Sequence, residues 1–222
     1  MALSLAQSLI EIRYILNEAT ASFWSDAELT AYLKEGCRIF SSKSLLVTNI
    51  GTISPMILTT PYYDSGDETF ISNILEIYSV IYNIGTSYKG LVQIHPRQIG
   101  NLAKSAVTGP PKYYCLFGKK LYIFPLASAV EVAGGTLDIL YSGRTDDITV
   151  IDDEYQHLPI IYAIAKALQK DKQFNQASLY MQQFFEEIAF ERSDKYQRGE
   201  DTIQDFKLKG TNQAMGTTNA RR

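Results

Sequence analysis

Apolar residues recur every three to four positions over residues 3–19 and again after Ser25, a spacing that predicts two amphipathic helices. The first apolar stripe contains Leu5, Leu9, Ile12, Leu16 and Ala19. The second contains Leu29, Leu33, Cys37 and Phe40. It fades into the serine-rich stretch at 41–44, so the pattern predicts a helical hairpin at the start of the chain.

The stretch FWSDAEL at residues 23–29 has the pattern of a helix start. Ser25 followed by Glu28 predicts a capping box, in which each side chain satisfies a backbone N–H of the first turn. Trp24 is placed to pack on Leu29 as a hydrophobic staple. The functional alternative is an acid pair beside an aromatic platform, but perturbed carboxylates at real sites come with further polar partners. We therefore interpret this stretch as structural.

From about residue 52 to 145 the pattern changes to short runs rich in Ile, Val, Tyr and Phe, separated by Pro, Gly and Asp. Such runs predict β-strands. They are ISPMILTT, ILEIYSVIYNI, YYCLF, LYIFP and GTLDILYS. The clearest hairpin is KYYCLFGKKLYIFP, in which Gly118 and two lysines form the turn and Pro125 ends the second strand.

Helical spacing returns after residue 157. Residues 158–168 are apolar at nearly every position except Lys166, which predicts a helix covered on most sides by its neighbours. Residues 174–198 carry one apolar stripe, which predicts a surface helix facing a core. Gly199 is expected to end that helix, and the residues after it include too few large apolar side chains to form a core.

The order of two helices, a β-region and two helices predicts an α+β fold. The simplest packing is a four-helix bundle, made from two N-terminal and two C-terminal helices, with a mostly antiparallel β-domain inserted between its halves. We expect a discontinuous helical domain of residues 1–50 and 151–199, an inserted β-domain of residues 51–150, and a flexible C-terminal tail of residues 200–222.

The composition is ordinary for a globular chain of 222 residues, but 15 Tyr and 10 Phe are typical of β-sheets and protein interfaces. A net charge of −3 gives no sequence-independent attraction to nucleic acid. Cys37 and Cys115 fall in different expected units, so we expect no disulfide framework. The sequence lacks a basic leader and a membrane-spanning segment of roughly 18 apolar residues, so we expect a cytosol-like compartment.

Candidate chemistry is sparse. The two histidines, His95 and His157, are far apart and the cysteines form no C-x-x-C, so no metal site is assigned. The acids of IDDEYQH, residues 151–157, could bind a hard cation or act as acid and base, but acids ahead of a helix also favour its dipole. YYDSGDE, residues 62–68, is interpreted as a polar turn. Phosphate-binding and serine-hydrolase motifs are absent from the sequence, so no catalytic or cofactor-binding residue is assigned.

The hairpin of residues 112–125 has apolar side chains on both faces, because residues alternate between the faces of a strand. One face is expected in the domain core, and the other against a helix or a second subunit. Three explanations of the two apolar faces remain: packing within the core alone, contact with a second subunit, and stacking on a ligand. The candidate subunit-contact residues are Tyr114, Leu116, Tyr122 and Phe124.

Three stretches, in this order, resemble the head-tail adaptor proteins of tailed bacteriophages, which are also called connector or neck proteins. They are FWSDAELTAYLKEGCRIF, LYIFP followed by GTLDILYSG, and LPIIYAIAKALQKDKQFNQASLYMQQFFEEI. Together they span most of residues 5–198. Glu35 and Gly36 depart from the family, in which this helix often carries an Asn-Glu or Asn-Ala pair.

The resemblance implies a structural virion protein without catalysis or cofactor, assembled in the host cytoplasm and located at the neck. It implies a ring, usually twelvefold, that joins the portal to a downstream tail protein and extends the channel for genome DNA without sequence-specific binding. It also implies that the tail of residues 200–222 becomes ordered by docking on the portal. The expected anchors of that tail are Phe206, Leu208 and Met215.

Two other functions remain as alternatives. In one, the aromatic β-domain is a binding module that recognises a glycan or another virion protein. In the other, the chain is an enzyme that uses the acids around Asp152. The second is the weaker alternative, because these acids lack an evident network of partners.

Overall fold

The computed structural model describes residues 3–18, 20–56, 60–103 and 108–213, with side chains described as far as residue 194. Within these ranges the chain has an α+β fold with six α-helices and two mostly antiparallel sheets. The helices are α1 (Leu5–Ile15), α2 (Asp26–Ser44), α3 (Ile99–Ala103), α4 (Ala129–Gly134), α5 (His157–Lys170) and α6 (Phe174–Gln213). The strands are β1 (Thr48–Ile53), β2 (Tyr62–Tyr63), β3 (Ile74–Ile84), β4 (Ser87–Gly90), β5 (Val92–Gln93), β6 (Tyr113–Phe117), β7 (Lys120–Phe124) and β8 (Gly135–Gly143). Short 3-10 turns are η1 (Thr69–Asn73), η2 (Pro96–Gln98), η3 (Ile148–Val150) and η4 (Asp153–Tyr155).

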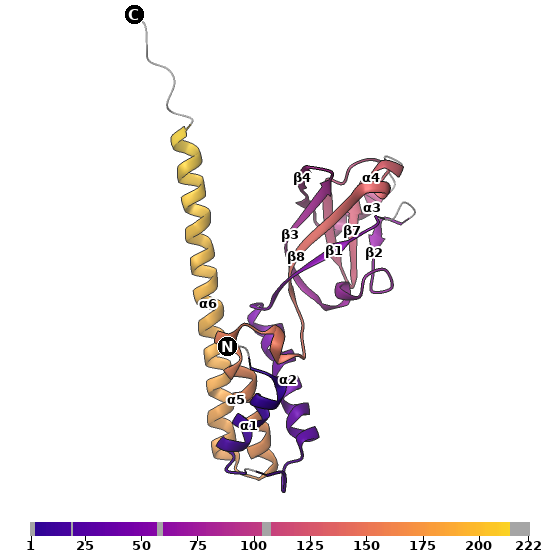
Figure 1. Cartoon of the computed structure of the whole chain (residues 1–222). Coiled ribbons are helices and arrows are strands. Elements are labelled where there is room, and N and C mark those ends of the chain that lie inside the picture. Colours follow the sequence, from indigo (N-terminus) through magenta and orange to yellow (C-terminus); the bar gives the residue numbers. More distant parts are fainter. Residues whose placement is uncertain (1–2, 19, 57–59, 104–107, 214–222) are drawn as a thin grey trace, which may run out of the picture.

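Helices from both ends of the chain share one hydrophobic core. α5 packs against α1, α2 and α6, and α2 also packs against α6 (Figure 1). The largest fully buried side chains of this core are Ile12, Leu29, Leu33, Phe40, Ile151, Leu158 and Phe184. α5 is buried on most sides, as its nearly continuous apolar sequence predicts.

The start of α2 is fixed by Ser25, whose hydroxyl oxygen accepts the backbone N–H of Glu28 at 3.2 Å. The reciprocal half of the expected capping box is absent from the described contacts. The reason is that the Glu28 carboxylate accepts hydrogen bonds from Lys170 at 2.7 Å and from the Tyr32 hydroxyl at 2.9 Å. Trp24 is buried in the helical core, and its indole N–H donates to a carbonyl of α5, at Ala167. The predicted helix start is confirmed, and it also attaches α2 to α5.

The β-domain is built from two four-stranded sheets. One has the strand order β1-β8-β3-β4 and the other β2-β7-β6-β5, and every pair is antiparallel except β5 with β6. Side chains from both sheets share a second core, separate from the helical one. It includes Ile53, Leu121, Ile123, Leu137 and Ile139. The mostly antiparallel prediction is confirmed. So is the hairpin turn, where Gly118 has the positive φ of 63° that suits a two-residue connection.

Two chain segments connect the domains, one after α2 and one after β8 (Figure 1). The backbone N–H of Gly143 donates to the carbonyl of Val47 at 2.9 Å, which joins the segments side by side. The backbone N–H of Thr145 donates to the Ser41 hydroxyl near the end of α2 at 3.2 Å. These bonds hold the β-domain at the C-terminal end of α2.

The expected end of the last helix is wrong, because α6 continues through Gly199 to Gln213. One glycine inside a helix costs only about 1 kcal/mol relative to alanine, and its neighbours Gln, Arg and Glu are good helix formers. The expected tail therefore has a helical backbone over residues 200–213, while residues 214–222 lie outside the described residues. At the other end of the chain, α1 stops at Ile15, and Ala19 lies outside the described residues.

The prediction of a strand over ISPMILTT is wrong, because β1 spans Thr48–Ile53, ends where that run begins, and leaves residues 54–56 outside any strand. Its ladder with β8 starts at the pair Thr48 and Ser142. This pairing joins residues almost a hundred positions apart, so local hydrophobic alternation carries no signal for it. The later part of ISPMILTT, residues 57–59, lies outside the described residues.

Candidate interaction surfaces

The β6–β7 hairpin has two apolar faces, as its alternating pattern predicts. Directly paired residues of antiparallel strands lie on the same face, so the register assigns each residue. The face toward the core between the sheets carries Tyr114, Leu116, Leu121 and Ile123. The outer face carries Tyr113, Cys115, Tyr122 and Phe124.

The four residues predicted as subunit contacts divide between these two faces. Tyr114 is 4% exposed and Phe124 is 2% exposed, so both are already packed within this chain. Leu116 and Tyr122 are half-buried and keep some accessible surface. Contact of these residues with a second subunit stays a prediction.

A cluster of aromatic rings lies on the outer side of this sheet. The ring centre of Tyr122 is 5.6 Å from that of Tyr62 and 6.4 Å from that of Phe124. The Lys120 ammonium lies 3.7 Å from the centre of the Tyr62 ring and 3.8 Å from the Asp64 carboxylate. Its hydrogen bond to Tyr62 raises the pKa of Lys120. The hairpin lysine is therefore engaged within the chain.

Asp64 also organises the YYDSGDE segment. Its carboxylate accepts the backbone N–H of Gly66 at 2.8 Å, and its own N–H donates to Asp67 at 2.9 Å. These local bonds between side chains and backbone define a turn from Asp64 to Asp67, which confirms the polar-turn interpretation for that part of the segment, whereas Tyr62 and Tyr63 form strand β2.

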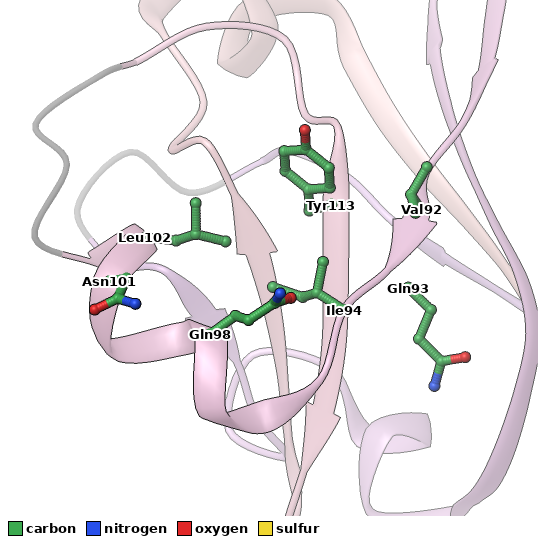
Figure 2. Close-up of a pocket in the computed structure, with 7 residues that line it drawn as sticks. All are labelled: Val92, Gln93, Ile94, Gln98, Asn101, Leu102 and Tyr113. Carbon is green, nitrogen blue, oxygen red and sulfur yellow. The ribbon is translucent and has the colours of Figure 1, made fainter.

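An open cavity of about 520 Å³ lies next to β5 and β6. Its lining residues are Val92, Gln93, Ile94, Gln98, Asn101, Leu102 and Tyr113. Figure 2 shows Ile94, Gln98 and Leu102 around one space, near the Tyr113 ring. The polar groups of this lining are neutral amides and a phenol, so the cavity offers hydrogen bonds without a carboxylate, an imidazole or a thiol.

α6 extends well beyond the core that it covers. Its buried side chains end at Ile188, and further along Arg192 donates to the carbonyl of Lys43 at 3.2 Å. The backbone then continues to Gln213, and Figure 1 shows this part projecting from the helical core. At 1.5 Å per residue, residues 193–213 form about 30 Å of helix. The anchors expected at 206 and 208 lie on this part, but their side chains lie outside the described residues, as does Met215 as a whole.

The acids of IDDEYQH lead into α5 through the turn η4. The residue that joins this segment to the core is the neighbouring Gln156, which is 1% exposed and donates to the carbonyls of Ile148 and Ile151. His157 Nε2 lies 3.0 Å from the Glu187 carboxylate at the surface. Within the described ranges, no group of three potential metal-binding side chains is found. Asp152 and the acids of η4 lie directly ahead of α5, which is the position that the preferred interpretation gives them.

A buried charge network, which the sequence pattern did not reveal, holds the connection between α1 and α2. Arg13 is 7% exposed, and its guanidinium pairs with Glu18 at 3.2 Å and with Asp26 at 2.6 Å. The Glu18 carboxylate also accepts the backbone N–H groups of Ser22 and Phe23. Burial opposes the ionisation of Glu18, but these hydrogen bonds prevail and lower its pKa to about 2. Asp26 of FWSDAEL thus has a structural role as a partner of Arg13.

The closest approach of α2 and α5 explains the two residues that depart from the phage adaptor pattern. A Cβ atom on Gly36 would lie 2.9 Å from the carbonyl oxygen of Pro159, so glycine lets the helices meet. The neighbouring Glu35 accepts the Tyr162 hydroxyl at 2.7 Å and lies 3.5 Å from Lys166. Both residues therefore serve the contact between α2 and α5.

The sequence of the chain is similar to one known protein family. A family model described as SU10 adaptor protein matches residues 4–204, from before α1 into the projecting part of α6. This chain belongs to the SU10 adaptor protein family. No curated protein matches the chain. The family confirms the resemblance to phage head-tail adaptors, so this SU10 adaptor is a structural protein of a bacteriophage virion.

Membership of this adaptor family implies an interaction with other virion proteins, so the candidate sites are the surfaces that could meet a partner. The surfaces described above are the outer face of the β6–β7 hairpin, the amide-lined cavity and the projecting part of α6. None of the described helices is both long enough and apolar enough to cross a membrane.

Proposed function

We propose that this SU10 adaptor forms a ring at the phage neck, joins the portal to a downstream tail protein, and extends the channel through which the genome passes. The subunit of this ring is a four-helix bundle of α1, α2, α5 and α6 with the β-domain inserted between its halves. The observation that carries the proposal is the projection of α6 from the helical core (Figure 1).

A helix that projects from the core gains little stability from its own sequence. Isolated helices are marginal in water, because most helix stability in proteins comes from tertiary packing of an apolar face. The segment beyond residue 199 has a polar composition with isolated large apolar residues, which is typical of chains that order on a partner. We propose the portal as that partner and Phe206, Leu208 and Met215 as the anchors.

The charge of the chain agrees with a conduit for DNA. Each subunit has a net charge of −3, which twelve copies would repeat around a ring. Acids that face the lumen would repel DNA weakly, because screening limits their effect to about 10 Å at moderate salt. The genome would then pass without tight or sequence-specific binding.

The experiment that tests this proposal is electron microscopy of the full chain mixed with the portal of the same phage, beside the portal alone. The expected result is an added tier with the symmetry of the portal, continuous with density for α6. A portal that stays intact and bare under these conditions would contradict the ring proposal. The variant with serine at positions 206, 208 and 215 is the matched control, and it should leave the portal bare; portal binding by this variant would contradict the anchors.

The aromatic cluster and the amide-lined cavity favour a second function, in which the β-domain binds a glycan. Sugars stack on aromatic rings and bind amide side chains. The rings lie on β2 and β7, and the amides come from β5 at the edge of the same sheet and from the neighbouring η2 and α3. A glycan module should bind as a monomer and lose affinity on Tyr122→Ala. A ring subunit with the same substitution should lose assembly instead.

A further inference from the structure

α1 has an exposed face in addition to the buried face that packs on α5 and α2. Ile10 and Tyr14 are four residues apart, and Glu11 lies three before Tyr14, so all three share one side of the helix. Ile10 is 67% exposed and Tyr14 is 85% exposed, while Ile12 on the other side is fully buried. This outer face combines two large apolar side chains with one exposed carboxylate.

A groove between α2 and α6 has the complementary character. It has a volume of about 530 Å³ and is lined by Phe185, Ile188, Ala189, Arg192 and Ser193 of α6 and by Lys43 at the end of α2. The five α6 residues are spaced i, i+3, i+4, i+7 and i+8, so they form one face of that helix. The bond from Arg192 to the carbonyl of Lys43 holds the two cationic residues side by side at the rim. The floor of this groove is apolar and its rim is positive.

We propose that the outer face of α1 of one copy packs into the α2–α6 groove of the next copy. The apolar side chains of Ile10 and Tyr14 cover the groove floor, and the Glu11 carboxylate meets the cations at its rim. Helix-in-groove association of this kind uses anchors with the spacing found here. The inference rests on the proposed ring and names one of its subunit contacts.

The two surfaces dictate how copies associate. The outer face of α1 and the α2–α6 groove belong to three different helices that all pack against α5, so the contact joins unlike patches (Figure 1). Unlike patches associate head to tail, and head-to-tail contacts close into rings when the rotation permits. A twofold dimer would require the same patch on both copies.

The small area of this contact indicates the conditions under which it forms. One short helix in a groove buries less than the roughly 800 Å² per partner of a stable interface. Copies held together on a scaffold have a high effective concentration, which strengthens a weak contact without any new interaction. The contact should therefore be weak between free chains and strong within an assembled tier.

The direct test uses cysteine cross-linking between copies. Both native cysteines, Cys37 and Cys115, are buried, so exposed engineered thiols are the reactive ones. The full chain with Ile10→Cys is mixed at high concentration with the full chain carrying Ala189→Cys, and the mixture is oxidised. The expected product is a disulfide-linked dimer of the two variants, because a disulfide needs Cα atoms within about 7 Å.

The matched control replaces Ala189→Cys by Gln183→Cys, an exposed α6 position on another face of the helix. The mixture of Ile10→Cys with Gln183→Cys should give no dimer, and equal yields from both mixtures would overturn the proposal. Charge reversal is a second test. Glu11→Lys and Lys43→Glu should each lower cross-linking roughly two- to fivefold, and the double variant should restore it.

The cross-link also separates this inference from the proposed function. An adaptor tier on the portal without a cross-link between positions 10 and 189 would overturn the α1 contact and leave the ring intact. A specific cross-link between free chains that add no tier to an intact portal would support the contact and contradict the ring. A failure of both measurements would overturn both proposals.

Discussion

The helical core and the β-domain core of this SU10 adaptor are built from opposite kinds of contact. The helical core brings Ile12 together with Phe184, so it joins the two ends of the chain. The β-domain core draws only on residues between Ile53 and Tyr141 and is continuous in sequence. The helical core forms only when residues from both ends of the chain come together. The β-domain has all of its core residues within one segment.

The two cores also differ in how they treat polar groups. The helical domain contains the Arg13 network, in which buried charges have partners. Among the described residues, the buried side-chain atoms without a hydrogen-bond partner belong to β3 and β8: Glu76 Oε2, Tyr82 OH, Asn83 Oδ1 and Ser142 Oγ. Unsatisfied buried atoms cost stability. Among the described residues, the buried polar side chains of the helical domain are therefore more completely hydrogen-bonded than those of the β-domain.

The largest expected effects come from deleting one side chain in each core. Phe40→Ala should destabilise the helical domain by about 4 kcal/mol, and Leu121→Ala should destabilise the β-domain by about 3 kcal/mol, because each leaves a cavity. Hydrogen exchange resolved by residue measures both. If the cores are separate, each variant should weaken protection mainly in its own domain. Equal loss of protection in both domains would show a single cooperative unit.

Breaking the charge network should have the next largest effect. Arg13→Met leaves Glu18 without its cation, which should lower the stability of the helical domain. Chemical denaturation followed by the fluorescence of Trp24, the single tryptophan, reports on this domain selectively. An unchanged unfolding midpoint would contradict a stabilising role of the network, and would mean that water screens its charges.

The Arg13 network also predicts that the stability of the protein depends on pH. The folded-state pKa of Glu18 is lowered to about 2, below the unfolded value of about 4.3. Its stabilisation is therefore fully present above about pH 5 and disappears as the pH falls toward 2. The stability advantage of the wild type over Glu18→Gln should shrink over that range in thermal unfolding experiments. An advantage that does not vary with pH would contradict the role of the charge.

A smaller effect is expected where α2 meets α5. Gly36→Ala forces a Cβ atom against the Pro159 backbone and should cost about 2 kcal/mol. Gly100→Ala in α3 is the matched control, because nothing lies within 4 Å of a Cβ atom there. The control should be neutral or stabilising by about 0.5 kcal/mol. Equal effects of both substitutions on the unfolding midpoint would remove the close approach as the reason for Gly36.

The smallest effect is expected at the start of α2. Ser25→Ala removes the cap on the Glu28 N–H and should cost about 1 kcal/mol. Ser25→Asp is the matched control and should keep the stability, because aspartate also caps well. Thermal unfolding of the three proteins checks this, and a loss in the aspartate variant equal to that in the alanine variant would contradict capping as the cause.

Local patterns were sufficient to predict the class of the fold. Helical spacing located α2 and α5, and strand alternation located the β6–β7 hairpin, because these elements bury the faces that their own sequences define. The start of β1 escaped prediction because its partner strand is distant in sequence. The end of α6 escaped because one glycine is a weak helix breaker when good helix formers flank it.

The interaction surfaces were harder to predict. Alternation along the hairpin gave two apolar faces, but only the paired register shows which face is inside. Arg13, Glu18 and Gln156 escaped altogether, because isolated polar residues within amphipathic stretches look like surface residues until their partners are known. The α2–α6 groove combines residues about 140 positions apart, so it has no local sequence signal.

Because the helical core needs helices from both ends of the chain, the two domains can fold at different times during synthesis. The ribosome finishes β8 before it starts α5, so a complete β-domain can fold while the chain is still being made. α1 and α2 emerge first but must wait for α5 and α6, with apolar faces uncovered in the meantime. Because the buried side chains of α6 end at Ile188, the core can close once that part of the helix has emerged, and the projecting part is added to a subunit that is already closed.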